Sequence, residues 1–314
     1  MKRIVSLLLL LALAIGMLAA CNPLEVDVAK INIGVMSGPT GMGMAKLMSE
    51  HGDNSDRYAF EIYSAPTDAT ADLISGDLDM LCLPTNTAAT LAAKHSELLS
   101  VIAVNTLGSL YLLTDADNQI NSIADLEGET IYASVPSSTT KPIIEYLLKE
   151  NGVNATVEFE ADHDALVARV KNGTASIAVL PEPKATVALK QNSAYSVDLN
   201  LSAEWDKVSD TPLTMGCIVV RNDFLKENKK SVDVFLSDYK ESIEYINTPA
   251  NLESSAQMIV DGGVLPQLPI AKGALSNLYG SIVYLDGAEM KSALEGFYTA
   301  IGLALPSDAF YYEK

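Results

Sequence analysis

Apolar runs of strand length alternate with helical patterns from Ile31 to Gln191, and this alternation constrains the fold more than any other feature of the chain. The first series runs through Ile31–Ser37, Met42–Glu50, Tyr58–Ser64, Ala69–Ser75, Leu78–Leu83 and Thr87–Lys94. The second series runs through Thr130–Ser134, Lys141–Asn151, Thr156–Glu160, Asp164–Lys171, Ser176–Leu180 and Ala185–Gln191. Such alternation is typical of parallel sheets with helices on both faces. We therefore predict an α/β fold with two such units in tandem.

Both units contain the same succession of a helix end, a glycine, a short strand and a proline. Gly76 precedes the strand that ends at Pro84, and Gly173 precedes the strand that ends at Pro181. Glycine suits the left-handed position after a helix, and proline ends a strand because it has no N–H group for the ladder. We expect the loops that follow the two prolines to face a shared cleft.

The N-terminus is typical of a cleaved export signal. Lys2 and Arg3 precede the apolar run Ile4–Met17, which is too short to span a bilayer comfortably. Leu18–Cys21 closes the run and resembles the bacterial lipobox, in which the cysteine is acylated and becomes the new N-terminus. We predict that residues 1–20 are removed, that Cys21 carries the lipid anchor and that residues 21–29 form a tether. An ordinary secretory signal that ends near a cysteine is the alternative.

Charge and cysteine content narrow the range of partners. The formal net charge of the 314-residue chain is −19, which disfavours nucleic acid and anionic lipid surfaces as partners.

Cys82 and Cys217 lie in apolar runs and are expected to be buried free thiols, with a disulfide as the alternative that export permits. His51, His95 and His163 are far apart, and CxxC and HExxH motifs are missing, so we expect no metal site and no cofactor.

The segment Asn172–Pro183, a glycine followed by a short strand and a Pro-Glu-Pro turn, resembles the NMT1/THI5-like and sulfonate/taurine-type solute-binding proteins of ABC importers. Other segments resemble the same family in the same order: Ile31–Val35, Ile123–Ile131 followed by Ser137–Thr140, and Ile218–Leu225. The resemblance covers about Lys30–Tyr245. The chain therefore resembles this family over most of its length.

The resemblance implies a type II periplasmic-binding-protein fold, in which two α/β lobes joined by two crossover strands close on a ligand by hinge motion. Lobe 1 is expected to comprise residues 30–108 and 220–314, and lobe 2 residues 109–219. Thr106–Thr114 and Leu213–Arg221 are the expected crossovers. The C-terminal part is expected to wrap lobe 1 with helices at Ser231–Asn247, Leu252–Val260 and Ala288–Ile301, with a loop around Pro266 and Pro269.

The function that the resemblance implies is that of an extracytoplasmic solute-binding lipoprotein. Such a protein captures a small polar or anionic metabolite and delivers it to the permease of an ABC importer. We expect this chain to act as a monomer held to a bacterial cell membrane by its lipid.

Open α/β sheets bind ligands at the carboxyl ends of their strands, which selects candidate residues in lobe 1. The loop Ser37–Gly43 follows the first strand, and its glycines permit close backbone approach to an anion held by N–H groups at a helix start. A simple tight turn is the alternative. Together with the loop after Pro84, the candidates are Ser37, Gly38, Thr40, Gly41, Met42, Thr85, Asn86 and Thr87.

In lobe 2, hydroxyl side chains and one carboxylate follow the predicted strands. Ser137, Ser138, Thr139 and Thr140 precede a helix and exceed what capping alone requires. Glu182 lies between two prolines, which fix the backbone and remove competing donors. We expect its carboxylate to face a ligand amine or hydroxyl, or the opposite lobe. A solvated acid in a rigid turn is the alternative.

The rival interpretation is an enzyme of the same fold that acts on a vitamin-precursor-like small molecule. Fold alone does not decide between the two, because one fold hosts many functions. The candidate loops contain no histidine and a single glutamate, which falls short of a catalytic arrangement. We therefore expect a binding protein without catalytic residues.

Overall fold

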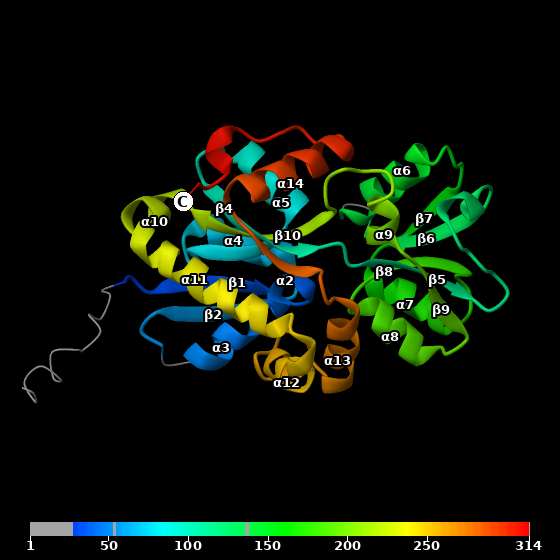
Figure 1. Ribbon diagram of the computed structural model, residues 1–314, viewed down its shortest axis with the longest axis horizontal. Coiled ribbons are helices and arrows are strands. Elements are labelled where there is room, and N and C mark those ends of the chain that lie inside the picture. Colours follow the sequence, from blue (N-terminus) through cyan, green and yellow to red (C-terminus); the bar gives the residue numbers. More distant parts are fainter. Residues whose placement is uncertain (1–27, 53–54, 136–137, 314) are drawn as a thin grey trace, which may run out of the picture.

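Two sheets lie side by side in the computed structural model, which describes residues 28–52, 55–135 and 138–313 (Figure 1). Sheet A has the strand order β11-β4-β10-β3-β1-β2, and sheet B has the order β7-β6-β8-β5-β9. We call sheet A with its helices lobe 1, and sheet B with its helices lobe 2. The prediction of two α/β units is confirmed.

Sheet A is mixed, because a strand from the second half of the chain runs against its neighbours. Its strands are β1 (Ile31–Met36), β2 (Tyr58–Tyr63), β3 (Met80–Pro84), β4 (Leu99–Leu107), β10 (Thr214–Arg221) and β11 (Ile282–Leu285). β1 pairs in parallel with β2 and β3, whereas β10 lies antiparallel between β3 and β4. The carboxyl ends of β3 and β4 therefore meet the start of β10.

Sheet B repeats this plan on a smaller scale. Its strands are β5 (Leu110–Asp115), β6 (Thr130–Ser134), β7 (Thr156–Glu160), β8 (Ile177–Pro181) and β9 (Tyr195–Asn200). β6 pairs in parallel with β7 and β8, and β5 lies antiparallel between β8 and β9.

Helices follow most strands and cover the faces of both sheets (Figure 1). Those up to the second crossover are α2 (Pro39–Met42), α3 (Ala45–His51), α4 (Pro66–Ser75), α5 (Thr85–Lys94), α6 (Thr140–Glu150), α7 (His163–Lys171), α8 (Lys184–Gln191) and α9 (Leu201–Trp205). The remainder are α10 (Asn222–Glu227), α11 (Lys229–Ile246), α12 (Leu252–Asp261), α13 (Leu268–Asn277) and α14 (Gly287–Ala300). The sequence predicted a loop where α13 begins. Pro269 instead occupies the first turn, where its missing N–H group costs nothing.

The chain passes between the two sheets at two places. Gly108 and Ser109 link β4 to β5, and residues 206–213 link α9 to β10. The expected crossover Thr106–Thr114 therefore consists of parts of β4 and β5, which belong to different sheets. β10 pairs with β3 and β4 from Thr214 onward, so the chain is back in sheet A before residue 220, where the sequence placed the boundary.

Among the described residues, the buried apolar side chains form three clusters, and one of these clusters spans both lobes. That shared cluster includes Leu213 and Trp205 from the second crossover region, Phe297 from α14 and Ile144 from α6. Another cluster lies in lobe 1 under α11, α12 and α13, and the third lies in lobe 2 under α7 and α8. The lobes therefore share packed apolar side chains near α14 and have separate cores near α13 and α8.

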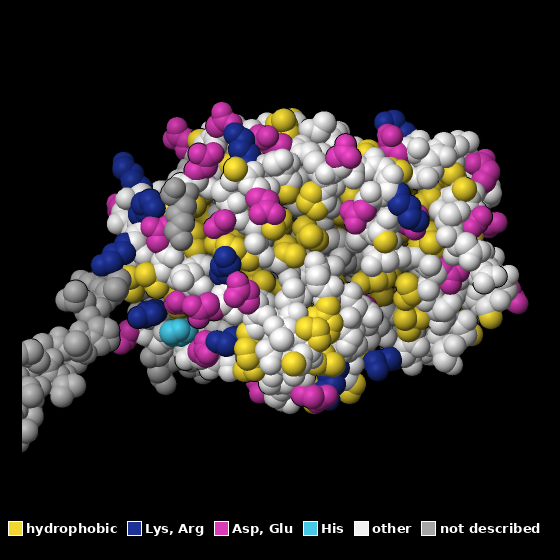
Figure 2. Space-filling model, in the orientation of Figure 1, with side chains coloured by type: hydrophobic (Ala, Val, Ile, Leu, Met, Phe, Trp, Pro, Cys, Tyr) yellow, Lys and Arg dark blue, Asp and Glu magenta, His cyan; other side chains and the backbone are white. Residues whose placement is uncertain are grey.

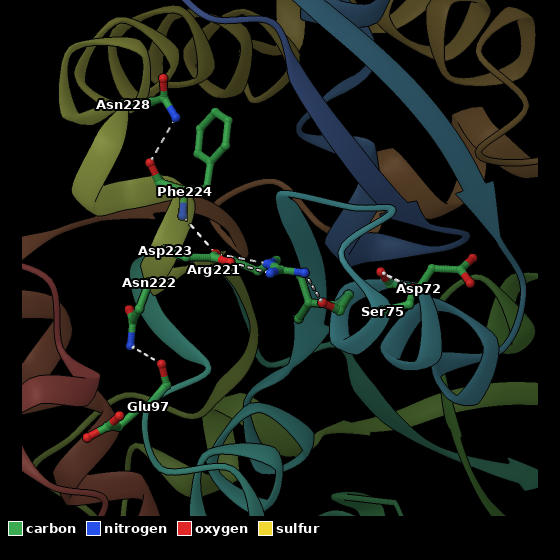
Figure 3. Close-up of polar contacts among 9 residues, drawn as sticks. Asp72, Ser75, Glu97, Arg221, Asn222, Asp223, Phe224 and Asn228 are labelled. Atoms are coloured by element: carbon green, nitrogen blue, oxygen red, sulfur yellow. Dashed lines mark hydrogen bonds and ion pairs between the residues drawn. The ribbon is translucent and has the colours of Figure 1, made fainter.

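A set of polar contacts fixes the end of β10 that lies away from the crossovers (Figure 3). The Arg221 guanidinium donates to the Leu73 carbonyl at the end of α4 and pairs with Asp223. Asn222 donates from Nδ2 to the Glu97 carbonyl at 3.0 Å. Because α4 and the segment before β4 are both held in this way, the return of the chain to lobe 1 is fixed by side-chain contacts as well as by the sheet.

The two buried cysteines are free thiols, so the disulfide alternative is wrong. Cys82 and Cys217 lie on neighbouring strands but belong to different core clusters, one on each face of sheet A. Burial raises the pKa of Cys82 to about 12 and raises that of Cys217 as well. Both side chains are therefore protonated packing residues at neutral pH.

Acidic and basic side chains are interspersed over both lobes on the face shown in Figure 2. This mixture, with an excess of carboxylates, suits a soluble surface better than a specific polyanion site. In the part of the chain that the structure describes, no helix combines the length and apolar character that a bilayer crossing requires.

Candidate ligand-binding cleft

The loop after β1 turns sharply into α2 at the edge of sheet A that borders the crossovers. Gly38 has φ 104°, a conformation that L-residues with a side chain rarely adopt. A Cβ atom on Gly41 would lie 2.1 Å from the Met36 carbonyl oxygen, so this position requires glycine for packing reasons. Ser37 is exposed, whereas Met42 is fully buried in the lobe 1 core. Of these candidates, Ser37 is open to solvent and Met42 contacts the protein interior.

Polar side chains from four elements meet at this edge. Asn105 on β4 donates from Nδ2 to the Thr40 carbonyl at 3.1 Å and accepts from Thr106 at 3.0 Å. Thr85, the first residue of α5, donates from Oγ1 to the Thr214 carbonyl at 2.9 Å. The structure therefore brings the candidates Thr40 and Thr85 together, with Asn105, Thr106 and Thr214 added to the set.

At this edge, Thr214 Oγ1 and Asn86 Oδ1 have no hydrogen-bond partner among the described residues. Thr214 is completely buried, and Asn86 lies in the first turn of α5 beside Thr87. Buried polar atoms are nearly always paired, with protein, water or a bound molecule. At this edge, one hydroxyl donor and one carbonyl acceptor are therefore without a partner among the described residues.

The facing edge in lobe 2 lies at the carboxyl ends of β6, β7 and β8. Glu182 follows β8 and donates from its backbone N–H to the Ser109 carbonyl in the first crossover at 2.9 Å. Because β6 and β7 run parallel to β8, their ends share this edge. At the end of β6, Ser138 accepts from the Thr140 N–H group at 3.3 Å, and Thr139 and Thr140 are buried at the start of α6. Ser137 lies outside the described residues.

Histidine and lysine side chains that the sequence analysis did not select lie at the same edge. Ser134 Oγ is 2.6 Å from His163 Nδ1, and Lys184 pairs with Asp164. Burial, together with the nearby Lys184 charge, lowers the pKa of His163, so its imidazole is neutral at neutral pH. His163 is the first residue of α7 after β7, so the strand-end rule that selected the other candidates would have found it.

Glu182 is 2% exposed, which excludes the solvated-acid alternative. Its Oε1 atom accepts from Asn277 Nδ2 in lobe 1 at 2.6 Å and from Thr186 Oγ1 at 3.0 Å. Oε2 accepts from the Thr186 N–H group at 3.2 Å. Burial raises the pKa of this carboxyl against the opposing effect of the three hydrogen bonds. In this arrangement the carboxylate faces the opposite lobe, one of the two expected orientations.

Among residues 28–52, 55–135 and 138–313, no group of three or more His, Cys, Asp or Glu side chains is arranged to hold a metal ion.

A family model described as "ABC transporter, phosphonate, periplasmic substrate-binding protein" matches residues 44–263. The chain belongs to this family. Its members are substrate-binding components of transporters, not enzymes, and the match covers α3 to α12, including both crossovers. The expectation of an ABC-transporter solute-binding protein is therefore confirmed, whereas the NMT1/THI5-like subfamily stays a prediction. No curated protein matches the chain.

Solved structures show the same fold. An ABC transporter protein from Parabacteroides distasonis has a TM-score of 0.75 at 19% identity, covering 91% of this chain and 99% of that one. The periplasmic aliphatic sulphonate-binding protein of Escherichia coli has a TM-score of 0.70 at 17% identity, with coverage of 91% and 92%. The periplasmic nitrate-binding protein of Synechocystis PCC 6803 has a TM-score of 0.64 at 14% identity, with coverage of 87% and 81%. The expected two-lobed periplasmic-binding-protein fold is confirmed.

Proposed function

We propose that this protein captures a small phosphonate-, sulfonate- or nitrate-type anion between its lobes and delivers it to an ABC importer. The observation that carries the proposal is the polar edge of lobe 1, where the buried Thr214 hydroxyl has no partner among the described residues. Family membership and the names of the structural neighbours supply the anion class. The candidates Ser37, Gly38, Thr40, Gly41, Met42, Thr85, Asn86, Thr87, Ser137, Ser138, Thr139, Thr140 and Glu182 stay proposals for the site.

The anion would be held by neutral donors. Hydroxyl groups and backbone N–H groups at the starts of α5 and α6 lie at the two edges, and helix N-termini favour negative charge. Asn86 Oδ1 would accept from the O–H group of a singly protonated phosphonate, a donor that nitrate and alkylsulfonates lack. Closure of the lobes would then remove water from the anion and strengthen each contact.

The test is a thermal-shift screen with alkylphosphonates, alkylsulfonates and nitrate, followed by calorimetry and product analysis of each hit. At 100-fold excess over its dissociation constant, a ligand that binds only the folded state adds about 2.7 kcal/mol of stability. Thr214→Val should weaken binding about tenfold because one hydrogen bond is lost. The ligand-free variant should be at least as stable as the wild type, since its buried hydroxyl has no partner to lose.

Thr114→Val is the matched control. Thr114 is also a buried strand threonine, but its Oγ1 donates to Asp198 within lobe 2 at 2.6 Å. The control should lose stability and keep its affinity for the anion. Unchanged affinity in Thr214→Val would remove this residue from the site, and chemical conversion of a hit would replace the transport function with catalysis.

We also propose that the mature protein begins at acylated Cys21 and acts as a monomer outside the cytoplasm. The sequence of the first 21 residues supports this, and those residues lie outside the described part of the structure. Cys21→Ser should move the protein from the membrane fraction to the soluble fraction. Retention of that variant on membranes would exclude the lipid anchor.

A further inference from the structure

The two lobes meet along a polar seam between α8 and α13, which lie next to each other at the junction (Figure 1). Among the residues that the structure describes, two hydrogen bonds cross this seam. Asn277 donates from Nδ2 to Glu182 Oε1 at 2.6 Å, and Tyr111 donates from its hydroxyl to the Asn277 carbonyl at 2.7 Å. A single residue at the end of α13 is therefore held by two residues of lobe 2.

On the lobe 2 side of the seam, hydrogen bonds within lobe 2 orient Glu182. Both Glu182 carboxylate oxygens are braced within lobe 2 by Thr186, and the Glu182 N–H group is bound to Ser109 in the first crossover. The carboxylate is therefore oriented before Asn277 arrives. A preoriented charged acceptor gains more from a donor than a mobile one, because less side-chain freedom is lost.

The apolar cores differ at the two sides of the lobe junction. At the α14 side, one cluster runs from Phe297 through Trp205 into lobe 2, with ring centroids 5.7 Å apart. At the α8 and α13 side, the lobe 1 and lobe 2 clusters are separate. A packed apolar contact resists separation because it would expose area to water, whereas polar groups that separate are hydrated. The α14 side of the junction is therefore suited to act as a pivot, and the side at α8 and α13 is suited to open.

We infer that Asn277 and Glu182 form a reversible latch that stabilises the closed arrangement of the lobes, with Tyr111 as its second anchor. This inference rests on the proposed hinge function and adds its regulation: the latch sets how much of the ligand-free protein is closed. Affinity follows from it, because a ligand that binds the closed state loses affinity in proportion to the fraction of protein that is open.

Hydrogen exchange of the ligand-free, full-length protein tests the latch without any ligand. Asn277→Ala should speed hydrogen exchange of the Thr186 amide about tenfold. The N–H group of Thr186 is bound to Glu182, and a tenfold change is expected when one hydrogen bond to a charged group is lost. Small-angle X-ray scattering should show a larger radius of gyration. The matched control is Asn151→Ala at the end of α6, where Nδ2 bonds to Leu147 within lobe 2 and no lobe contact is lost. In Asn151→Ala, the rate of hydrogen exchange of the Thr186 amide should equal that of the wild type.

Gly273→Ala tests the seam by crowding Thr186 rather than by removing a hydrogen-bonding side chain. A Cβ atom there would lie 2.8 Å from Thr186 Cγ2, so alanine should force α13 away from α8 even though it favours the helix itself. Faster exchange at Thr186 in both Asn277→Ala and Gly273→Ala supports the latch. Unchanged exchange in either variant overturns it. These exchange measurements use no ligand. If the screen finds no anion that binds, the proposed function is contradicted, but the result on the latch still holds.

Discussion

Gly76 ends α4 in a left-handed conformation with φ 93°, and the Arg221 guanidinium lies against it. A Cβ atom at this position would lie 2.3 Å from Arg221 Nη1. Gly76→Ala should therefore lower the free energy of unfolding in two ways, by straining the backbone and by breaking the Arg221 contacts. We expect it to lose about 1 kcal/mol more than Gly280→Ala, where φ is 83° and no atom lies within 4 Å of the added Cβ. Urea unfolding measures both, and equal losses would contradict the role of Arg221.

Burial of Glu182 raises its pKa, and the sign of the pH dependence follows. The folded state binds this proton more tightly than the unfolded state, so the stabilisation is present below the unfolded pKa of about 4.3 and is lost as pH rises through the raised folded value. Glu182→Gln removes this titration. The melting temperature of Glu182→Gln relative to wild type should therefore increase as pH rises from 4 to 7. A melting-temperature difference between Glu182→Gln and wild type that stays constant from pH 4 to 7 would contradict the expectation.

Residue-level prediction from the sequence succeeded where local rules apply and failed where partners are distant. Gly76 and Gly173 both have positive φ, as their positions after helices required. The two prolines that flank Glu182 allowed the prediction that its carboxylate faces a ligand or the opposite lobe. Its partner Asn277 could not be predicted, because it is 95 residues away on a helix that the sequence did not reveal. Thr214 was missed because an ordinary strand threonine carries no signal for an unpaired hydroxyl.

At the scale of elements, the first crossover is packed against the helix that precedes the second. A Cβ atom on Gly108 would lie 1.8 Å from Ser202 Oγ on α9 and 3.0 Å from Leu213 Cδ2. Gly108→Ala should therefore cost about 1–3 kcal/mol by overpacking and alter the lobe angle. Removing the obstructing side chain in the double variant Gly108→Ala with Ser202→Gly should recover part of the loss. Calorimetric unfolding and scattering measure the two effects, and additive losses in the double variant would contradict the steric account.

The elements that the sequence predicted best are those with strong apolar patterns. β6 and β7 have the predicted boundaries, and the helices of both units begin within a few residues of their predicted starts. β9 was missed because it is an edge strand with three exposed residues among six, and therefore lacks an apolar run. α13 was missed because two nearby prolines indicate a loop unless one of them begins a helix.

At the scale of the whole molecule, Trp205 joins the lobes. It is fully buried, donates from Nε1 to the Thr211 carbonyl at 2.7 Å and packs between Tyr146 of lobe 2 and Phe297 of lobe 1. Trp205→Ala should cost about 3–5 kcal/mol, the usual range for a buried tryptophan. Trp205→Phe should cost less because an aromatic ring remains. Circular dichroism during denaturant unfolding gives both values, and a loss below about 1 kcal/mol in the alanine variant would contradict the stabilising role of Trp205 in the shared core.

The position of β10 has a consequence for the order in which the two lobes can form. This strand lies between β3 and β4, yet it follows all of lobe 2 in the chain. For a polypeptide that crosses a membrane from its N-terminus, residues 110–200 supply all five strands of sheet B before the strand that completes the centre of sheet A has emerged. During translocation the part of lobe 1 that precedes lobe 2 therefore has no complete sheet to join, and we expect lobe 2 to fold before it returns the missing strand.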